Sequence, residues 1–276
     1  MNDRIADLPL GKVVDYRDEY DPALLCPFPR AGKRAEIGLA GELPFAGYDL
    51  WNAYELSWLA PGGKPVVAMA EFRFPCTSPF IVESKSFKLY LNSLNQTCFA
   101  DRTEVASNIE RDLSIACGAA VGVRLLPLAA FTDAVIDGLP GRCLDDLEVS
   151  IDRYALDPSL LDGSADSGQI VEETLHSHLL KSNCLVTRQP DWASVLVRYR
   201  GPRIDPAALL RYLVSYRQHS EFHEQCVERI FTDLLRCCRP EQLTVYARYT
   251  RRGGLDINPF RSNFETELPN WRLARQ

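Results

Sequence analysis

Two stretches, YLNSLNQ at residues 90–96 and YLVSYRQ at residues 212–218, carry the same Tyr, Leu, Ser and Gln at a constant offset. A second match follows in each half after a one-residue gap, and it pairs Ile109 with Ile230, Asp112 with Asp233 and Leu113 with Leu234. Repeats of this kind indicate a duplicated structural unit, with a chance match of short stretches as the alternative. The sequence predicts two modules, residues 1–150 with an extended N-terminal arm (1–45) and residues 151–276.

The hydrophobic pattern gives the same order of elements in both halves. Apolar residues alternate at 70–74, 194–199 and 243–249, which predicts strands, and Val121–Leu128 is a further predicted strand. Helical spacing follows Asp101, a typical N-cap with Glu104 three residues later, and recurs at Cys226, Ile230 and Leu234. We therefore expect an α+β fold in which each module is an antiparallel sheet with helices packed on one face. The Asp-, Ser- and Gly-rich segment 157–169 is the best candidate for a loop or an inter-domain segment.

Composition limits the class of protein. The 276 residues are 46% hydrophobic and 25% charged, with a net charge of −6, so no basic nucleic-acid face is expected. No apolar run is long enough for a membrane span, and the N-terminus lacks a signal-peptide core. The nine cysteines form no C-x-x-C pair and indicate free thiols in a reducing compartment. We expect a cytoplasmic protein.

Residues 181–192, KSNCLVTRQPDW, place Cys184 in a polar setting with Asp191 seven residues later. A reactive cysteine needs a partly exposed site and nearby positive charge, because only the thiolate attacks. Lys181 and Arg188 could supply that charge. Taken alone, a packing role is the commoner fate of a free cysteine.

Three further stretches concentrate chemically useful residues: VESKSFKLY at 82–90, EFHEQC at 221–226 and YTRRGGLDINP at 249–259. The first and third combine basic residues with glycines or a carboxylate, which suits phosphate. The usual fate of such runs is a solvated charged face for the first and a basic turn after a strand for the third. The second places His223 and Glu224 at a helix start, where an ordinary N-terminal acid is the simpler explanation. No Rossmann or P-loop motif is present.

A metal centre is the competing interpretation. His176 and His178 are two residues apart and would share a strand face, so together with Cys184 they could bind zinc. Two histidines and one thiol are a small ligand set, so we expect no metal and assign these residues to a structural role or a simple strand surface.

Taken together and in this order, ESKSFKLYLNS (83–93), SNCLVTRQPDW (182–192), SEFHEQCVERI (220–230) and YTRRGGLDINP (249–259) resemble the NADPH-dependent 7-cyano-7-deazaguanine reductases of queuosine biosynthesis. The resemblance is to the long, two-module bacterial form and extends over nearly the whole chain. It implies two tandem tunnelling-fold modules and a homo-oligomer, with a dimer favoured. It also implies a division of labour, because the first half keeps the ESKSFKLY motif and the second keeps the cysteine and the His–Glu pair.

The resemblance assigns catalytic roles. Cys184 would add to the nitrile carbon to give a covalent thioimide, and Asp191 would donate a proton to the nitrogen. Such a donor needs a pKa raised by burial, because it must hold its proton near neutral pH. Two hydride transfers from NADPH would then give 7-aminomethyl-7-deazaguanine, and His223 would assist proton movement.

Binding roles come from the same resemblance. Glu224 would accept hydrogen bonds from the adjacent donors of the guanine-like edge, and Glu83 would hold another part of the base. The substrate contacts it implies are Val82, Glu83, Ser84, Phe222, His223 and Glu224. The NADPH contacts are Ser84, Lys85, Arg252 and Gly253.

Two other functions remain open at this point. One is a metal-dependent cyclohydrolase of the same fold, with Cys184, His176 and His178 as ligands. The other is a non-catalytic module that binds purines or pterins. For the reductase, the partners expected are a small deazaguanine substrate and a second copy of the chain, with no direct nucleic acid and no membrane.

Overall fold

The computed structural model describes residues 16–276, which form two compact units. The first comprises the described residues up to Lys33, Asp49–Val135 and Arg251–Asp256, and the second comprises Arg34–Tyr48, Ile136–Thr250 and Ile257–Gln276. The module boundary at residue 150 stays a prediction, because compactness alone does not show which segments fold independently. Residues 1–15 of the predicted arm lie outside the described residues.

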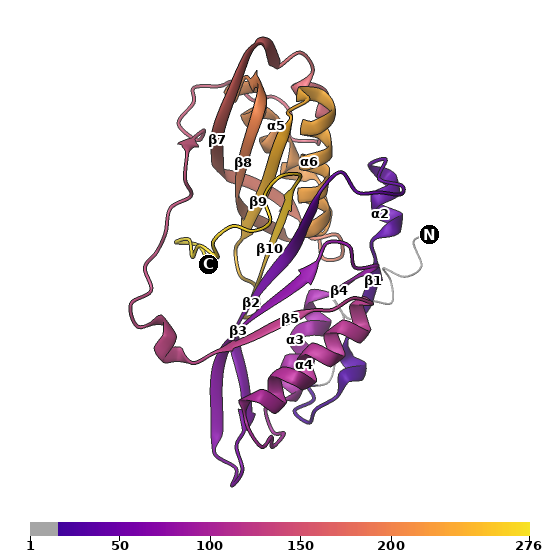
Figure 1. Ribbon diagram of the computed structural model, residues 1–276, viewed down its shortest axis with the longest axis vertical. Helices are drawn as coiled ribbons and strands as arrows, with labels where there is room; N and C mark the ends of the chain where they lie inside the picture. The colour runs from indigo at the N-terminus through magenta and orange to yellow at the C-terminus, as the bar shows by residue number, and fades with distance from the viewer. Residues whose placement is uncertain (1–15) are drawn as a thin grey trace. The chain divides into compact units, whose positions relative to one another are not determined.

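Unit 1 contains three neighbouring strands in the order β5-β3-β2, and a separate small antiparallel pair formed by β1 and β4. Its elements are η1 (Pro22–Leu24), β1 (Pro27–Pro29), β2 (Ala46–Leu59, here from Asp49), β3 (Pro65–Pro75), β4 (Phe80–Val82), α3 (Ser84–Ser93), α4 (Arg102–Cys117), β5 (Gly122–Leu126) and η2 (Leu128–Phe131). Phe87 of α3 packs edge-on against Phe72 of β3 and Trp51 of β2, with ring centroids 4.9 and 5.4 Å apart. Helices α3 and α4 therefore cover one face of this sheet (Figure 1).

Unit 2 contains the strand order β10-β9-β8-β7-β6, antiparallel except for the short β6–β7 pair. Its elements are β6 (Arg142–Cys143), η3 (Pro158–Leu161), β7 (Ala165–Asn183), β8 (Pro190–Ile204), α5 (Pro206–Ser215), η4 (Tyr216–Gln218), α6 (His223–Cys238), β9 (Gln242–Tyr249) and β10 (Leu255–Ser262, here from Ile257). The short helix α2 (Ala31–Glu36) spans the change from unit 1 to unit 2 along the chain. Helix α6 packs on β9 and β8, and α5 packs on β7 (Figure 1).

The two units make the same hydrogen bonds at matched positions. Tyr90 donates to Asp112 at 2.7 Å, and its counterpart Tyr212 donates to Asp233 at 2.7 Å. The matched serines donate to the carbonyls of these tyrosines, at 2.7 Å from Ser93 and 2.6 Å from Ser215. Residues that recur in sequence thus hold the same helix pair together in each unit. The chain is α+β, with two tandem tunnelling-fold modules.

The strands predicted at 70–74, 194–199 and 243–249 are confirmed within β3, β8 and β9, and Asp101 caps α4 through Glu104 N at 2.9 Å. Two segments differ in detail from the sequence pattern. The described part of the predicted arm contains the short elements η1, β1 and α2. Segment 157–169 lies inside unit 2, because Asp157 caps η3 and β7 already begins at Ala165. The first residues of β7 are mostly exposed and polar, so the strand carries no apolar alternation there.

Among the described residues, no helix combines the length and apolarity that crossing a bilayer demands.

Candidate active site

Cys184 lies in the tight turn that joins β7 to β8. Its N–H donates to the carbonyl of Gln189 at 2.8 Å, and its own carbonyl accepts from Arg188 N at 2.9 Å. Arg188 has a φ of 57°, a left-handed conformation that lets the turn close within few residues. The cysteine is 4% exposed, so it is more buried than the partly open site that the sequence suggested.

Lys181, one of the two predicted sources of positive charge, is held by polar neighbours. Its ammonium donates to Asn183 Oδ1 at 2.6 Å and to the carbonyl of Arg217 at 2.7 Å. Loss of hydration lowers the pKa of Lys181, and the charge of Arg217 lowers it further. The lysine thus fixes the end of β7 next to Cys184.

Asp191 lies opposite Ser182 in the β7–β8 pairing, one step from the Asn183–Pro190 pair that precedes the turn. It is 3% exposed, and its Oδ2 is 3.2 Å from Nε2 of His223. The imidazole of His223 stacks on the ring of Tyr249, with centroids 3.9 Å apart and planes at 22°. The structure therefore brings the predicted proton donor into contact with the predicted histidine.

The chain that leads into α6 is attached to the end of β7. Asn183 N donates to the carbonyl of His219 at 2.8 Å, and Glu221 N donates to the carbonyl of Asn183 at 3.1 Å. This pairing brings the start of α6, with Phe222 at the N-cap and Glu224 in the first turn, close to the residue before Cys184. Glu224 is 3% exposed. The structure therefore brings five predicted residues into one region of unit 2: Cys184, Asp191, Phe222, His223 and Glu224.

Glu221 is a residue that the sequence patterns did not identify. It is 1% exposed, accepts two hydrogen bonds from Arg229 at 2.7 and 3.0 Å, and lies 2.9 Å from His219 Nε2. Burial alone would raise the pKa of Glu221, but the hydrogen bonds from His219 and Arg229 outweigh it, and the pKa is lowered. An ionised carboxylate therefore fixes the segment that carries Phe222, His223 and Glu224. The only sequence sign was an acidic residue eight positions before an arginine.

In unit 1, Glu83 is the N-cap of α3. Its carboxylate accepts from the backbone N–H groups of Lys85 and Ser86, both at 2.8 Å, and it is 1% exposed. Burial raises the pKa of Glu83, although these two hydrogen bonds partly oppose the shift. Val82, the preceding residue, is also buried at 2%. A carboxylate has about four acceptor sites, so capping leaves room for a ligand donor.

The glycine turn of the YTRRGGLDINP stretch lies against the same helix. Arg252 and Leu255 exchange backbone hydrogen bonds at 2.8 and 3.2 Å, which closes the turn. Gly253 has a φ of 59°, and a side chain there would meet Lys88 Cδ at 3.1 Å. Two of the predicted phosphate-binding stretches are therefore in contact within unit 1, and Lys85, Lys88 and Arg252 all keep solvent exposure.

The zinc ligand set that the alternative function needs is not assembled. Among the described residues, the ligand atoms of His176 and His178 gather with the thiol of Cys143, and Cys184 is absent from that group. The reason is distance along β7, because His176 lies seven residues before the strand's end at Asn183. Cys184 and the histidines belong to different places on the sheet.

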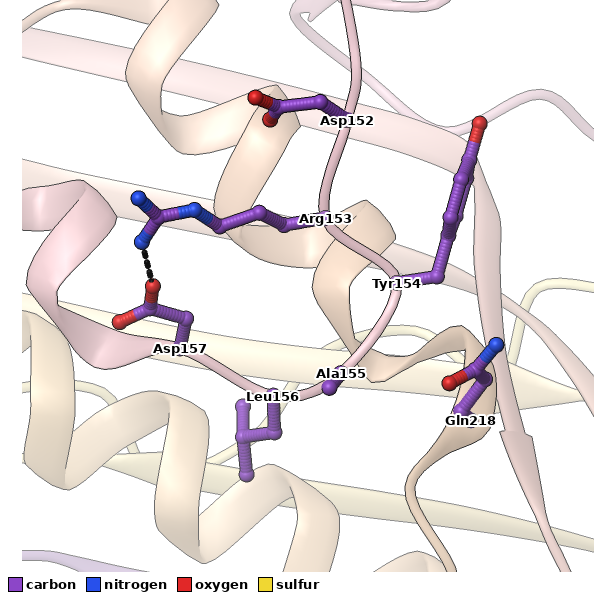
Figure 2. A pocket seen from close by; sticks show the side chains of 7 residues that line it. All are labelled: Asp152, Arg153, Tyr154, Ala155, Leu156, Asp157 and Gln218. Carbon is purple, nitrogen blue, oxygen red and sulfur yellow. Dashed lines mark hydrogen bonds and ion pairs between the residues drawn. The ribbon is translucent and has the colours of Figure 1, made fainter.

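A pocket of about 450 Å³ in unit 2 is lined by residues 152–157 and Gln218. Figure 2 shows the ion pair between Arg153 and Asp157 on its wall, with Tyr154 and Gln218 close to each other at another part of the rim. The backbone N–H of Gln218 donates to the carbonyl of Tyr154 at 2.9 Å. None of the predicted site residues lines this pocket.

Comparisons with known proteins identify the family of the chain. The family model described as "Nitrile reductase, 7-cyano-7-deazaguanine-reductase N-term" matches residues 16–125, and the model described as "QueF-like protein" matches residues 190–267. A crystal structure of the archaeosine synthase QueF-Like in the apo form is 18% identical, and the match covers 36% of this chain and 96% of that one with a TM-score of 0.30. The two family models together match more than half of the chain, and Cys184 lies between the two matched ranges. The chain belongs to the QueF family of nitrile reductases, the two-module 7-cyano-7-deazaguanine reductases.

Proposed function

We propose that this protein reduces the nitrile of 7-cyano-7-deazaguanine to the primary amine of 7-aminomethyl-7-deazaguanine, with two NADPH, in tRNA queuosine biosynthesis. The observation that carries the proposal is the cluster in unit 2. The Cys184 turn, Asp191, and the buried start of α6 are joined by the Asn183 backbone bonds and by the Asp191–His223 contact. In the same proposal the enzyme is a cytoplasmic homodimer.

The cluster suits covalent addition to a nitrile. The Cys184 thiolate bonds to the nitrile carbon, one π-bond of the nitrile breaks, and the nitrogen takes a proton from Asp191. The product is a thioimide that contains every atom of the base. The contact between Asp191 and His223 gives the acid a route by which its proton can be replaced.

The base-binding groups are buried acids in each unit. Glu224 accepts the ring N–H and the exocyclic amine of the guanine-like edge, and Glu83 holds another part of the base. Phe222 packs on the ring, and Val82, Ser84 and His223 complete the contacts. Burial favours these roles, because hydrogen bonds to a carboxylate are stronger away from water.

The cofactor residues fit a phosphate-bearing molecule. NADPH supplies the hydride when bound. The contact between the glycine turn and Lys88 places Arg252 and Gly253 beside the helix that carries Ser84 and Lys85. Positive side chains with a close backbone suit the 2′-phosphate that distinguishes NADPH from NADH.

The decisive experiment is the intact mass of the protein after incubation with 7-cyano-7-deazaguanine and no NADPH. We expect the mass to increase by the full mass of the base, because addition releases no leaving group. Cys184→Ala should abolish the adduct, whereas Cys98→Ser, which removes an exposed thiol, should keep it.

Two outcomes would contradict the proposal. An adduct that persists in Cys184→Ala would assign the nucleophile elsewhere. Tight base binding without any adduct in the unmodified protein would favour the non-catalytic purine-binding module.

A further inference from the structure

A second cluster of potential ligands lies in unit 2, at the pairing of β6 with β7. The Cys143 thiol and one ring nitrogen each of His176 and His178 all lie within 4.8 Å of one another. His176 is 8% exposed, and the other two residues are partly exposed. The proposed nitrile chemistry uses none of the three.

The backbone is built to bring Cys143 to this place. β6 runs parallel to β7, with Cys143 opposite His176, and Leu144 N donates to the carbonyl of His176 at 2.9 Å. Gly141 has a φ of 87°, and a Cβ there would lie 2.1 Å from the carbonyl oxygen of Thr174. Only glycine permits so close an approach, so this position keeps the cysteine against the strand.

Both histidines are oriented through Nδ1. His176 Nδ1 is 3.0 Å from the carbonyl of Pro140, an acceptor that requires the ring to donate from this nitrogen. His178 Nδ1 is 2.7 Å from Ser194 Oγ, and Ser194 is 3% exposed. Nε2 of His176 therefore carries the lone pair that a metal needs, and Nε2 of His178 carries one when its Nδ1 donates to the Ser194 hydroxyl. Metal-binding histidines in proteins are held by outer hydrogen bonds of this kind.

Asp145 fixes the strand between the two rings. Its carboxylate accepts from Ser177 Oγ at 2.6 Å and from His178 N at 3.0 Å. Arg275 also donates to the carbonyl of His178 at 2.8 Å. The two imidazoles are therefore held on one face of β7 by contacts on both sides of the strand.

We propose that Cys143, His176 and His178 bind one Zn²⁺ ion that fastens the β6 segment to β7. Thiolate and imidazole are the ligands that zinc prefers, and a fourth, solvent ligand would complete a tetrahedron. Binding replaces the Cys143 S–H proton with a Zn–S bond, and the proton passes to solvent. Around tetrahedral zinc the ligand atoms would be roughly 3.3–3.7 Å apart. Side-chain rotations that move these atoms by about 1 Å would therefore close the site.

The test uses untagged full-length protein, stripped with a chelator and titrated with Co²⁺ and then with Zn²⁺. We expect one equivalent of Co²⁺ to give a thiolate-to-metal charge-transfer band and the intense visible bands of tetrahedral cobalt, and Zn²⁺ to remove both. Cys143→Ser should lose the charge-transfer band, and His176→Gln should weaken binding at least about tenfold through loss of one ligand. Cys98→Ser and Cys184→Ala should bind as the unmodified protein does.

The outcomes separate this proposal from the reductase. No stoichiometric binding in the unmodified protein, or binding that survives Cys143→Ser and disappears in Cys98→Ser, would overturn the zinc site. Cys143→Ser should still form the Cys184 adduct with the nitrile base, whereas loss of that adduct together with the metal would show that the two sites are not separate.

Discussion

Replacing Glu83 by Ala should lower both the free energy of unfolding and the affinity for the base. The matched variant Asp205→Ala separates the two effects. Glu83 caps α3 in unit 1, and the same position of the repeat in unit 2 is Asp205, which caps α5 through the N–H groups of Ala207 and Ala208 at 3.1 and 3.3 Å. Asp205 is exposed and has no proposed role in binding. Asp205→Ala therefore measures the value of the cap alone.

The size of each loss follows from the contacts. An N-cap is worth about 0.5–2 kcal/mol, and the two 2.8 Å bonds to Glu83 favour the upper part of that range. The cost of keeping this carboxylate buried, visible in its raised pKa, offsets part of the gain. We expect both variants to lose about 1 kcal/mol of unfolding free energy. Glu83→Ala alone should also lose about 1.5–3 kcal/mol of base binding, or roughly 10- to 150-fold in Kd.

Urea unfolding monitored by circular dichroism gives the first quantity, and calorimetric titration with 7-cyano-7-deazaguanine gives the second. Cys184→Ala should serve as the background for titration, since it prevents the covalent step. Equal stability losses with unchanged base affinity in both variants would refute a binding role for Glu83 and leave it as a helix cap. Weakened binding in Asp205→Ala as well would show that affinity follows stability rather than contact.

Three other perturbations test separate contacts. Asp191→Asn should slow adduct formation by roughly 10²–10⁴-fold, which is the usual contribution of a general acid, and should leave base affinity nearly unchanged. Equal rates of adduct formation in a mass-spectrometric time course would remove Asp191 from the mechanism. Glu228→Ala removes the buried carboxylate that Arg34 and Arg261 contact at 2.7–3.1 Å. It should lower the free energy of unfolding, measured with urea, by about 3–5 kcal/mol, and a loss below about 1 kcal/mol would contradict this. Burial raises the folded-state pKa of Glu83 above 4.5, so the stability its protonated form contributes is present below that pH and is lost as pH rises through the raised pKa. Glu83→Gln should gain stability relative to the unmodified protein over that window, and parallel pH profiles would refute the assignment.

Local patterns were enough to predict much of the fold. Apolar alternation in the sequence located β3, β8 and β9. Burial alternates along β3, whereas β9 and the middle of β8 are buried at almost every residue. The N-cap Asp101 located the start of α4, because its carboxylate serves the adjacent backbone. The repeat at Tyr90 and Tyr212 predicted the duplication, and each tyrosine proved to bond to the aspartate of the second match.

Contacts between distant residues could not be predicted in this way. Arg34 and Glu228 are 194 residues apart, and no periodicity connects them. Cys143 joins His176 only because Gly141 lets a two-residue parallel strand approach β7, and the sequence pattern had grouped the histidines with Cys184 instead. Residue type identified the reactive groups, but the pairing of strands decided which of them meet.

Burial distinguishes the proposed binding acids from ordinary helix caps. In the repeat, Glu83 at the start of α3 corresponds to the exposed Asp205, and Glu224 at the start of α6 corresponds to the exposed Thr103 of α4. Capping works well at the surface, as Asp205 shows, whereas burying a carboxylate costs free energy unless it is paired. Each module nevertheless buries one acid at a helix start, and it does so at a different helix. A capping role alone gives no reason to bury Glu83, and this favours the proposed contact between Glu83 and a ligand.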